Sequence, residues 1–414
     1  MKLLHTSDWH VGKAIRGHSR AGEHRAVLTE IANVAEAEQV DLVLVAGDLF
    51  DTAAPTAESE RIVYDSLLQL AEVAPVLVIA GNHDSAKRLD AVARLLALGR
   101  VTVAVSPRAP ADGGVVNLDL AGTPVQVAFL PFVSQRAIVR ADALMDAEAF
   151  RNAQTYSERM RAVIAALTAG FSADCVNLLL AHAFVIGGVV GGGERPAHIV
   201  DEYAISSVDL PATTSYVALG HLHRAQAIAG ATSIHYCGSP LQLDFGERTE
   251  AKQVNIVDVE PGLPAKVKAV PLSAGSPLLT LTGTVAQLAG FASAGDLPEG
   301  AWIRAVVAEA SRAGLADEVR DALGDRVVDV RLDAPDQQRR SKRSPDRATR
   351  TPSQQFAAYL DERDVDDQRL QDAFDLLLDE LTTPDDPETQ PELHADTQSP
   401  PEADQQAEQL SLGT

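Results

Sequence analysis

Apolar runs and helical patterns alternate along the first hundred residues of the chain. Short apolar runs at 2–6, 41–46 and 75–80 have the length and composition of buried strands. Each is followed by a stretch in which apolar residues recur with helical spacing, at 21–38, 57–72 and 86–98. Because strands and helices that alternate in this way build a sheet covered by helices, the pattern predicts a layered α/β domain.

Strand patterns become more frequent after residue 100. One further helix is predicted over about 150–169. The predicted strands are 101–105, 115–120, 125–130, 176–181, 215–219, 225–229, 233–237 and 253–258. Two mixed sheets packed face to face, with the helices outside, would bury all of these elements, so we expect residues 1–270 to form a two-sheet sandwich flanked by helices.

The pattern changes after Pro271. Residues 271–335 read as strand, helix, strand, helix and strand, which predicts a small α+β domain without catalytic residues of its own. Residues 336–352 form a basic linker, either solvated or in contact with phosphate or an acidic partner. Residues 353–382 return to helical spacing with an apolar face suited to docking on a partner, and the acidic tail 383–414 is expected to be disordered.

Composition limits the class of protein. The 414 residues carry a net charge of −23, but residues 361–414 alone contribute −15, which leaves −8 for the rest. This acidity weakens a nucleic-acid interpretation without excluding it, because bound divalent cations would offset part of it locally. We find no apolar run long enough to span a membrane and no signal segment, so we expect a soluble, cytoplasmic protein. The two cysteines are expected to be inert core thiols.

Metal-capable side chains follow several of the apolar runs, at the point where each run ends. The carboxyl ends of strands in open α/β sheets face the crevice in which ligands bind. The candidate ligands are Asp8, His10, Asp48, Asn82, His182, His221 and His223. Oxygen and nitrogen ligands without a thiolate suit Mn²⁺, Fe or a mixed octahedral site, and seven are about right for two ions that share one carboxylate. Such a pair favours phosphoryl displacement by an activated water, without a serine or cysteine nucleophile.

His83 lies between Asn82 and Asp84, and adjacent side chains cannot all face the metals. We prefer Asn82 as the ligand and His83 as the proton donor to the leaving oxygen, with Asp84 orienting His83. The alternative makes His83 the ligand and Asn82 a turn residue. Among the other histidines, His5 is expected in the core and His24 on the surface.

The glycine-rich stretch 187–193 is expected to be a mobile loop. The chain has no G-x-x-x-x-G-K-[ST] motif, so this loop is not a phosphate cradle. Any requirement for ATP would therefore have to be met by another subunit.

The blocks D-W-H, A-G-D, G-N-H-D, A-H and G-H-L-H resemble those of the calcineurin-like metallophosphoesterases over about residues 1–225. The longer stretches LHTSDWHVGK, VAGDLFDTAAP, YVALGHLHRAQ and YCGSPLQLDFGE are similar to the SbcD family, the nuclease subunits of bacterial SbcCD complexes. This second resemblance extends over about residues 1–380. It implies a metallophosphoesterase sandwich, a capping domain that binds DNA and C-terminal helices that dock on the ATPase.

The resemblance also implies a di-manganese site. One ion would be held by Asp8, His10, Asp48 and His223, and the other by Asp48, Asn82, His182 and His221, with His83 as the catalytic acid. The implied activity is 3′→5′ exonuclease on DNA ends and endonuclease on single strands and hairpins. An SMC-type, SbcC-like ATPase would hydrolyse the ATP, and the nuclease subunits would pair within a heterotetramer. The alternatives are a small-molecule phosphatase or phosphodiesterase of the same fold and a non-catalytic scaffold at DNA ends.

Overall fold

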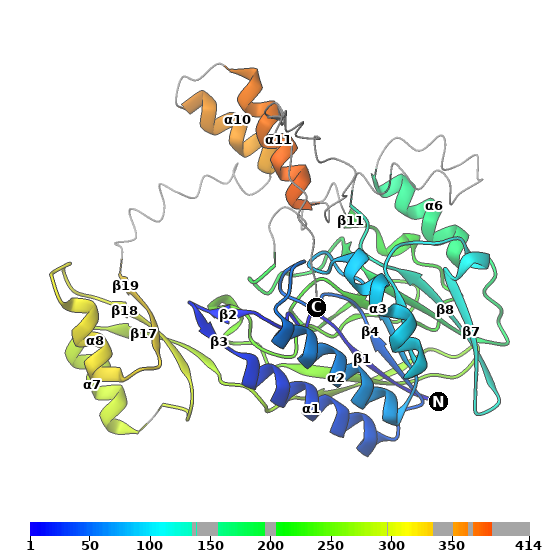
Figure 1. Cartoon of the computed structure of the whole chain (residues 1–414), viewed down its shortest axis with the longest axis horizontal. Helices are drawn as coiled ribbons and strands as arrows, with labels where there is room; N and C mark the ends of the chain where they lie inside the picture. The colour runs from blue at the N-terminus through cyan, green and yellow to red at the C-terminus, as the bar shows by residue number, and fades with distance from the viewer. Residues whose placement is uncertain are drawn as a thin grey trace, which may run out of the picture. The chain divides into compact units, whose positions relative to one another are not determined.

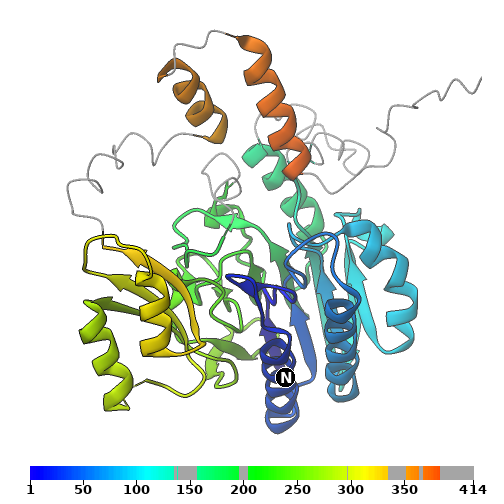
Figure 2. The same cartoon turned by 60° about the vertical axis from the view of Figure 1, so that its left-hand side comes forward.

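Two six-stranded sheets form the centre of the computed structural model (Figures 1 and 2). The first sheet has the order β16 (Lys266–Pro271), β15 (Gln253–Asp258), β1 (Lys2–Thr6), β4 (Leu42–Val45), β5 (Val76–Ile79), β6 (Val101–Ala104). The second has the order β13 (Gln226–Ile228), β14 (Ile234–Tyr236), β12 (Tyr216–Gly220), β9 (Val176–His182), β8 (Thr123–Leu130), β7 (Val115–Leu120). Strands β1, β4, β5 and β6 run parallel, as do β8, β9, β12 and β14.

The structure describes residues 1–134, 138, 156–194, 204–295, 297–333, 351–362 and 367–382. The basic segment 336–350 and the acidic tail 383–414 lie outside the described residues, as does the start of the helix predicted from residue 150.

A continuous apolar layer joins the inner faces of the two sheets. Leu3, Leu42 and Leu44 of the first sheet pack in one cluster with Phe129, Leu178 and Leu180 of the second. Neighbouring residues of the same strands, such as Leu4 and Val43, point to the opposite face, because side chains alternate along a strand. Both faces of the central strands are therefore buried, which is why their sequences are apolar throughout.

Helices cover the outer faces of the sandwich. The helices α1 (Ala21–Glu38), α2 (Ala57–Val73) and α3 (Ala86–Leu98) pack on the first sheet, and α6 (Tyr156–Thr168) packs on the second. The N-terminus of α2 is capped by Thr56, whose side chain accepts a hydrogen bond from the N–H of Ser59. None of the described helices combines the length and apolar composition needed to cross a bilayer.

The two-sheet sandwich with flanking helices is thus confirmed, with additions. Strand β16 was not predicted, because it is an edge strand with mostly exposed side chains and its sequence contains two lysines. The structure also adds the hairpin β2 (Ala14–Ile15) and β3 (His18–Ser19), the short pair β10 (Phe184–Val185) and β11 (Ala204–Ile205), and three single turns of 3₁₀ helix, η1 (Pro110–Asp112), η5 (Ser207–Asp209) and η6 (Phe245–Glu247).

A smaller sheet follows in the chain. The parallel strands β17 (Leu278–Gly283), β18 (Trp302–Val307) and β19 (Val327–Leu332) are covered on one side by α7 (Val285–Ala294) and α8 (Leu315–Leu323), as Figure 2 shows. These five elements were predicted. Two further helices, α10 (Pro352–Glu362) and α11 (Gln368–Thr382), pack together through Phe356 and Phe374, whose ring centroids are 4.1 Å apart.

Candidate metal centre

The turns after five strands bring the candidate residues to one edge of the sandwich. Asp8 and His10 follow β1, Asp48 follows β4, and Asn82 to Asp84 follow β5. His182 is the last residue of β9, and His221 and His223 follow β12. All of these side chains are buried except that of Asn82, which is half-buried. Four of the residues have left-handed backbone conformations, with φ between 46° and 107° (Asp8, His10, Asp48 and His221). Strain of this kind is held where the surrounding structure fixes a functional geometry.

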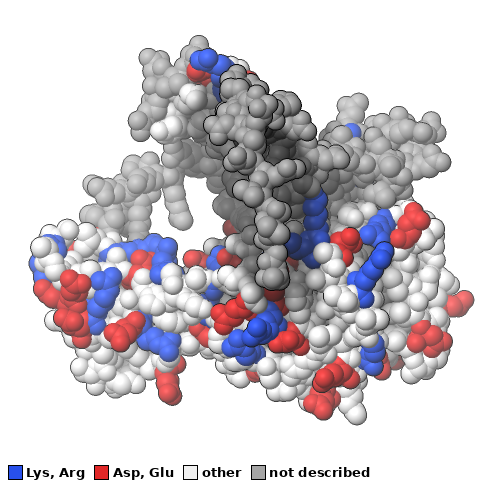
Figure 3. All heavy atoms as spheres, viewed as in Figure 1, with Lys and Arg blue, Asp and Glu red and all other residues white. Residues whose placement is uncertain are grey.

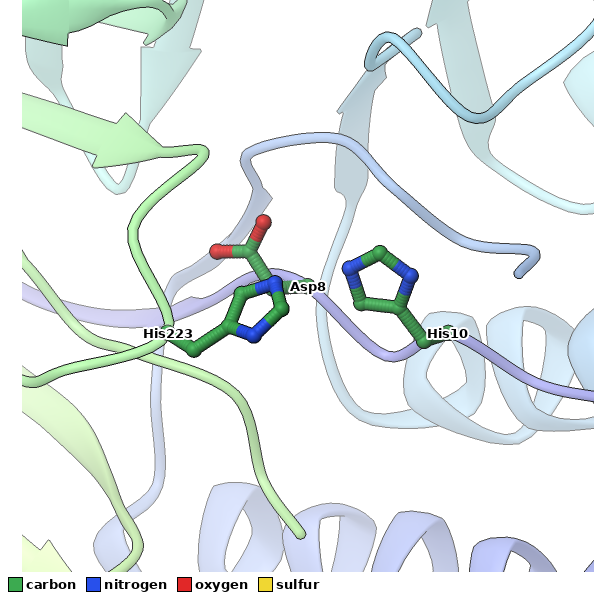
Figure 4. Close-up of side chains that lie close together, drawn as sticks. All are labelled: Asp8, His10 and His223. Carbon is green, nitrogen blue, oxygen red and sulfur yellow. The ribbon is translucent and has the colours of Figure 1, made fainter. Parts of the chain in front are cut away.

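A first group of ligand atoms comes from the turns after β1 and β12. Atoms of Asp8, His10 and His223 lie within 4.8 Å of one another. Figure 4 shows one ring nitrogen of His10 pointing toward the other two side chains. The Nε2 atom of His10 is 3.5 Å from Oδ2 of Asp48, so Asp48 borders this group.

A second group meets on the other side of Asp48. The Nε2 atom of His182 is 3.5 Å from Oδ2 of Asp48 and 2.9 Å from Oδ1 of Asn82. The same Asn82 oxygen is 2.9 Å from Nδ1 of His221. Asp48 therefore lies between two groups of potential ligands, which is the position expected for a bridging carboxylate.

The chemistry of these side chains fits a divalent cation. Among the described residues, neither ring nitrogen of the buried His10 makes a hydrogen bond. Burial raises the pKa of Asp8 to about 6, which reflects the cost of an ionised carboxylate there without a cation beside it. The site offers carboxylate and amide oxygens and imidazole nitrogens, without a thiolate. Mn²⁺, Fe and related hard or borderline ions prefer ligands of these kinds. The site therefore binds divalent metal.

His83 lies at the edge of the first group. Its ring centroid is 4.6 Å from that of His10, and its Nδ1 atom is 2.6 Å from the carbonyl oxygen of Asp51. Because a carbonyl can only accept, Nδ1 carries the hydrogen of this contact. His10, Asp48 and His83 also lie close enough to share an ion, so this geometry leaves both roles of His83 open.

The carboxylate of Asp84 bonds to main-chain groups of two neighbouring turns. It accepts hydrogen bonds from the N–H groups of Leu49, Phe50 and Gly81, at 3.2, 3.0 and 2.9 Å. Asp84 therefore connects the turns that carry Asp48 and Asn82, while the carbonyl of Asp51 contacts Nδ1 of His83.

Other side chains around the centre were not singled out from the sequence. The side chain of Asp51 lies 3.7 Å from Nδ1 of His10. The side chains that contact His223 or its main chain are Glu194, Glu247 and Lys252. In the glycine-rich loop, the N–H groups of Gly191 and Gly192 donate to Glu194. His24 was expected on the surface but is buried in α1, where its Nδ1 atom contacts the carbonyl of Arg20.

Known proteins resemble this chain in sequence. Residues 1–126 match the calcineurin-like phosphoesterase family. The chain is 37% identical over 284 residues to SbcD of the nuclease SbcCD from Bacillus subtilis, covering 67% of this chain and 71% of that protein. It is 34% identical over 298 residues to the protein of the same name from Rhodobacter capsulatus, with coverages of 68% and 71%. The Escherichia coli K12 protein is 30% identical over 302 residues, with coverages of 70% and 72%.

Proposed function

Since this chain belongs to the SbcD family of SbcCD nucleases, we propose that it is a metal-dependent DNA nuclease working with an SbcC-like ATPase. The proposed activities are ATP-dependent 3′→5′ exonuclease on double-stranded ends and endonuclease on single strands and hairpins, in DNA repair, replication and recombination. The observation that carries the proposal is the position of Asp48 between two groups of buried ligands. Phosphodiester hydrolysis by two ions uses such an arrangement.

We assign two Mn²⁺ ions to the two groups. Asp8, His10 and His223 would hold one ion, Asn82, His182 and His221 the other, and Asp48 would bridge them. When bound, the ions supply an activated water and positive charge for the phosphoryl oxygens. The protein's part is to hold the seven side chains, all buried except the half-buried Asn82, at the ends of five strands, where the backbone fixes them before substrate arrives.

His83 is the proposed proton donor to the leaving oxygen. The contact of its Nδ1 atom with the carbonyl of Asp51 fixes the ring and reserves Nε2 for the proton that is transferred. Asp84 acts indirectly, through the main chain of the turns that hold Asp48 and Asn82.

The second domain, residues 271–335, is proposed to position DNA. On the face in Figure 3, lysines and arginines are interspersed with acidic side chains. We therefore propose that DNA phosphates meet the metal centre and dispersed basic side chains of the second domain, such as the exposed Arg326, instead of one continuous basic patch.

Two apolar surfaces support the proposed partners. Leu68 on α2 and Leu95 and Leu98 in the last turn of α3 are 41%, 68% and 85% exposed. We propose that a second nuclease subunit pairs on this surface. The exposed Tyr359 of α10 and Leu377 of α11 support docking of residues 353–382 on the ATPase, giving a heterotetramer. A DNA substrate would place the complex in the cytoplasm, at the nucleoid.

Cleavage of end-labelled hairpin and duplex DNA tests this function. With Mn²⁺, we expect wild-type protein to cut DNA, His83→Ala to lose activity at least a hundredfold while retaining Mn²⁺, and the ATPase with ATP to extend digestion. Asp48→Ala should abolish cleavage by removing the bridging carboxylate. Turnover of bis-p-nitrophenyl phosphate without cutting of any DNA would reassign the chain to the small-molecule phosphodiesterases.

Docking of the ATPase is tested separately. Deleting residues 353–382 should leave Mn²⁺ binding unchanged and abolish co-purification with the ATPase. If the shortened chain still co-purified, the docking surface would lie elsewhere.

A further inference from the structure

His223 is held by contacts to both its main chain and its ring. Its main-chain N–H donates to Oε1 of Glu194 at 3.0 Å, and its carbonyl oxygen accepts from Nζ of Lys252 at 3.1 Å. Its ring Nδ1 is 2.9 Å from Oε1 of Glu247. The other ring nitrogen, Nε2, lies on the side of Asp8 in Figure 4. The ring is thus fixed through Nδ1 and the main chain, and Nε2 faces the first ligand group.

Glu247 is fully buried and has a buried cation as its partner. Its second oxygen, Oε2, accepts from Nζ of Lys252 at 2.7 Å and from the N–H of Leu243 at 3.0 Å. The pairing with Lys252 offsets the cost of burying the carboxylate charge. An ionised carboxylate can only accept hydrogen bonds, so Nδ1 of His223 must carry the hydrogen and Nε2 presents its lone pair.

The glycine-rich loop closes over this pair. A Cβ atom on Gly193 would lie 2.6 Å from Oε1 of Glu247 and 2.8 Å from Nδ1 of His223, closer than such atoms approach in folded proteins. The main chain of the loop therefore packs directly against the hydrogen bond between Glu247 and His223. Glycine is required at this position because any side chain would separate the two residues.

We propose that Glu247 is a positioning residue that fixes the ring orientation and tautomer of His223 for a divalent cation, with Lys252 as its charge partner. The inference rests on the proposed ligation by His223. A carboxylate that accepts from a metal-bound imidazole holds the ring in place and makes it a stronger ligand, and removing such a partner weakens metal binding about 10–100-fold.

Binding of Mn²⁺ to the full-length chain, followed by electron paramagnetic resonance and calorimetry, tests the proposal. Glu247→Gln keeps the side-chain volume but removes the charge. We expect one of the two ions to bind about 10–100-fold more weakly, and the other within about twofold of wild type. Glu23→Gln is the matched control, because Glu23 pairs with the buried Arg20 in the same domain and the structure gives it no contact with a proposed ligand. It should bind both ions as wild type does.

A second variant separates positioning from folding. Glu247→Gln leaves the charge of Lys252 buried without its carboxylate, whereas Glu247→Gln combined with Lys252→Met removes both charges. If the double variant unfolds in EDTA at the wild-type temperature and still binds one ion weakly, positioning is supported. Wild-type affinity for both ions in either folded variant would overturn the inference.

His223→Ala distinguishes this inference from the proposed function. Loss of the same ion in His223→Ala supports the ligand assignment. If His223→Ala bound both ions normally, the ligand assignment itself would fail. If His223→Ala lost one ion while Glu247→Gln kept both at full affinity, only the role of Glu247 would be wrong.

Discussion

Gly220, the residue before His221, allows a quantitative test of how closely the two sheets approach. It ends β12 and pairs with His182 of the neighbouring strand. A Cβ atom on Gly220 would overlap with the carbonyl oxygen of Ala46 in the other sheet and lie 2.9 Å from Nδ1 of His182. That carbonyl accepts the hydrogen bond of Nδ1 of His182 at 2.7 Å. One methyl group would therefore occupy the space of a buried hydrogen bond that orients a proposed ligand.

The expected cost of Gly220→Ala has two parts. Overpacking a close-packed core costs about 1–3 kcal/mol. Breaking the buried contact between His182 and Ala46 adds about 1–3 kcal/mol. We therefore expect the free energy of unfolding in EDTA to fall by about 2–6 kcal/mol. We also expect weaker binding of the ion assigned to Asn82, His182 and His221, because the His182 ring loses its support.

Urea unfolding in EDTA and titration with Mn²⁺ measure the two effects. Gly290→Ala is the matched control, because Gly290 lies inside α7 with nothing within 4 Å of the added carbon. It should leave metal binding unchanged and stabilise the fold by about 0.5–1 kcal/mol. A Gly220→Ala protein as stable as wild type, with both ions bound normally, would show that the sheets have room for a side chain and refute the reasoning.

Two further predictions concern charge and the second domain. Burial has the largest single effect on the pKa of His182 and lowers it, but Asp48, Asp8 and the carbonyl of Ala46 together raise it to about 9 in the metal-free protein, above its ordinary value of 6.5. Because the pKa of His182 is higher in the folded than in the unfolded chain, protonation of this ring stabilises the fold. The contribution is complete below the unfolded pKa and is lost as the pH rises through the folded pKa. Between about pH 7 and 9 in EDTA, the free energy of unfolding should therefore fall by up to about 3 kcal/mol. Urea titrations should show this loss, and Asp48→Asn should flatten it. Trp302→Phe removes the 2.8 Å hydrogen bond from Nε1 to Glu23 and should cost about 1–3 kcal/mol in thermal unfolding, while Trp9→Phe, which loses a bond to neutral Thr6, should cost less.

The sequence was sufficient to predict every strand of the two large sheets except β16, and the placement of the proposed ligands after them, because both depend on local periodicity. Every proposed ligand ends or follows an apolar run, and parallel strands carry their ends to one edge. The prediction that His24 lies on the surface was wrong because it rested on residue type. His24 is three residues before Val27 on the buried face of α1, so the helical spacing itself indicates burial. The hydrogen-bond partners of the proposed ligands could not be predicted from the sequence, for another reason. Glu247 is 24 residues from His223, and only the fold determines that a carboxylate in a 3₁₀ turn meets that ring.

The two halves of the metal centre are held by different parts of the protein. His182 and Asn82 lie where the two sheets meet, and their contacts are to the ends of neighbouring strands. His10 leads instead into the β2–β3 hairpin, in which Ile15 packs with Phe245, Leu278 and Trp302. Phe245 lies two residues before Glu247, the partner of His223, and the guanidinium of Arg304 stacks over its ring at 4.0 Å. Both histidines of the first ligand group are therefore connected within a few residues to the second domain, whereas His182 and His221 depend on the packing of the sandwich.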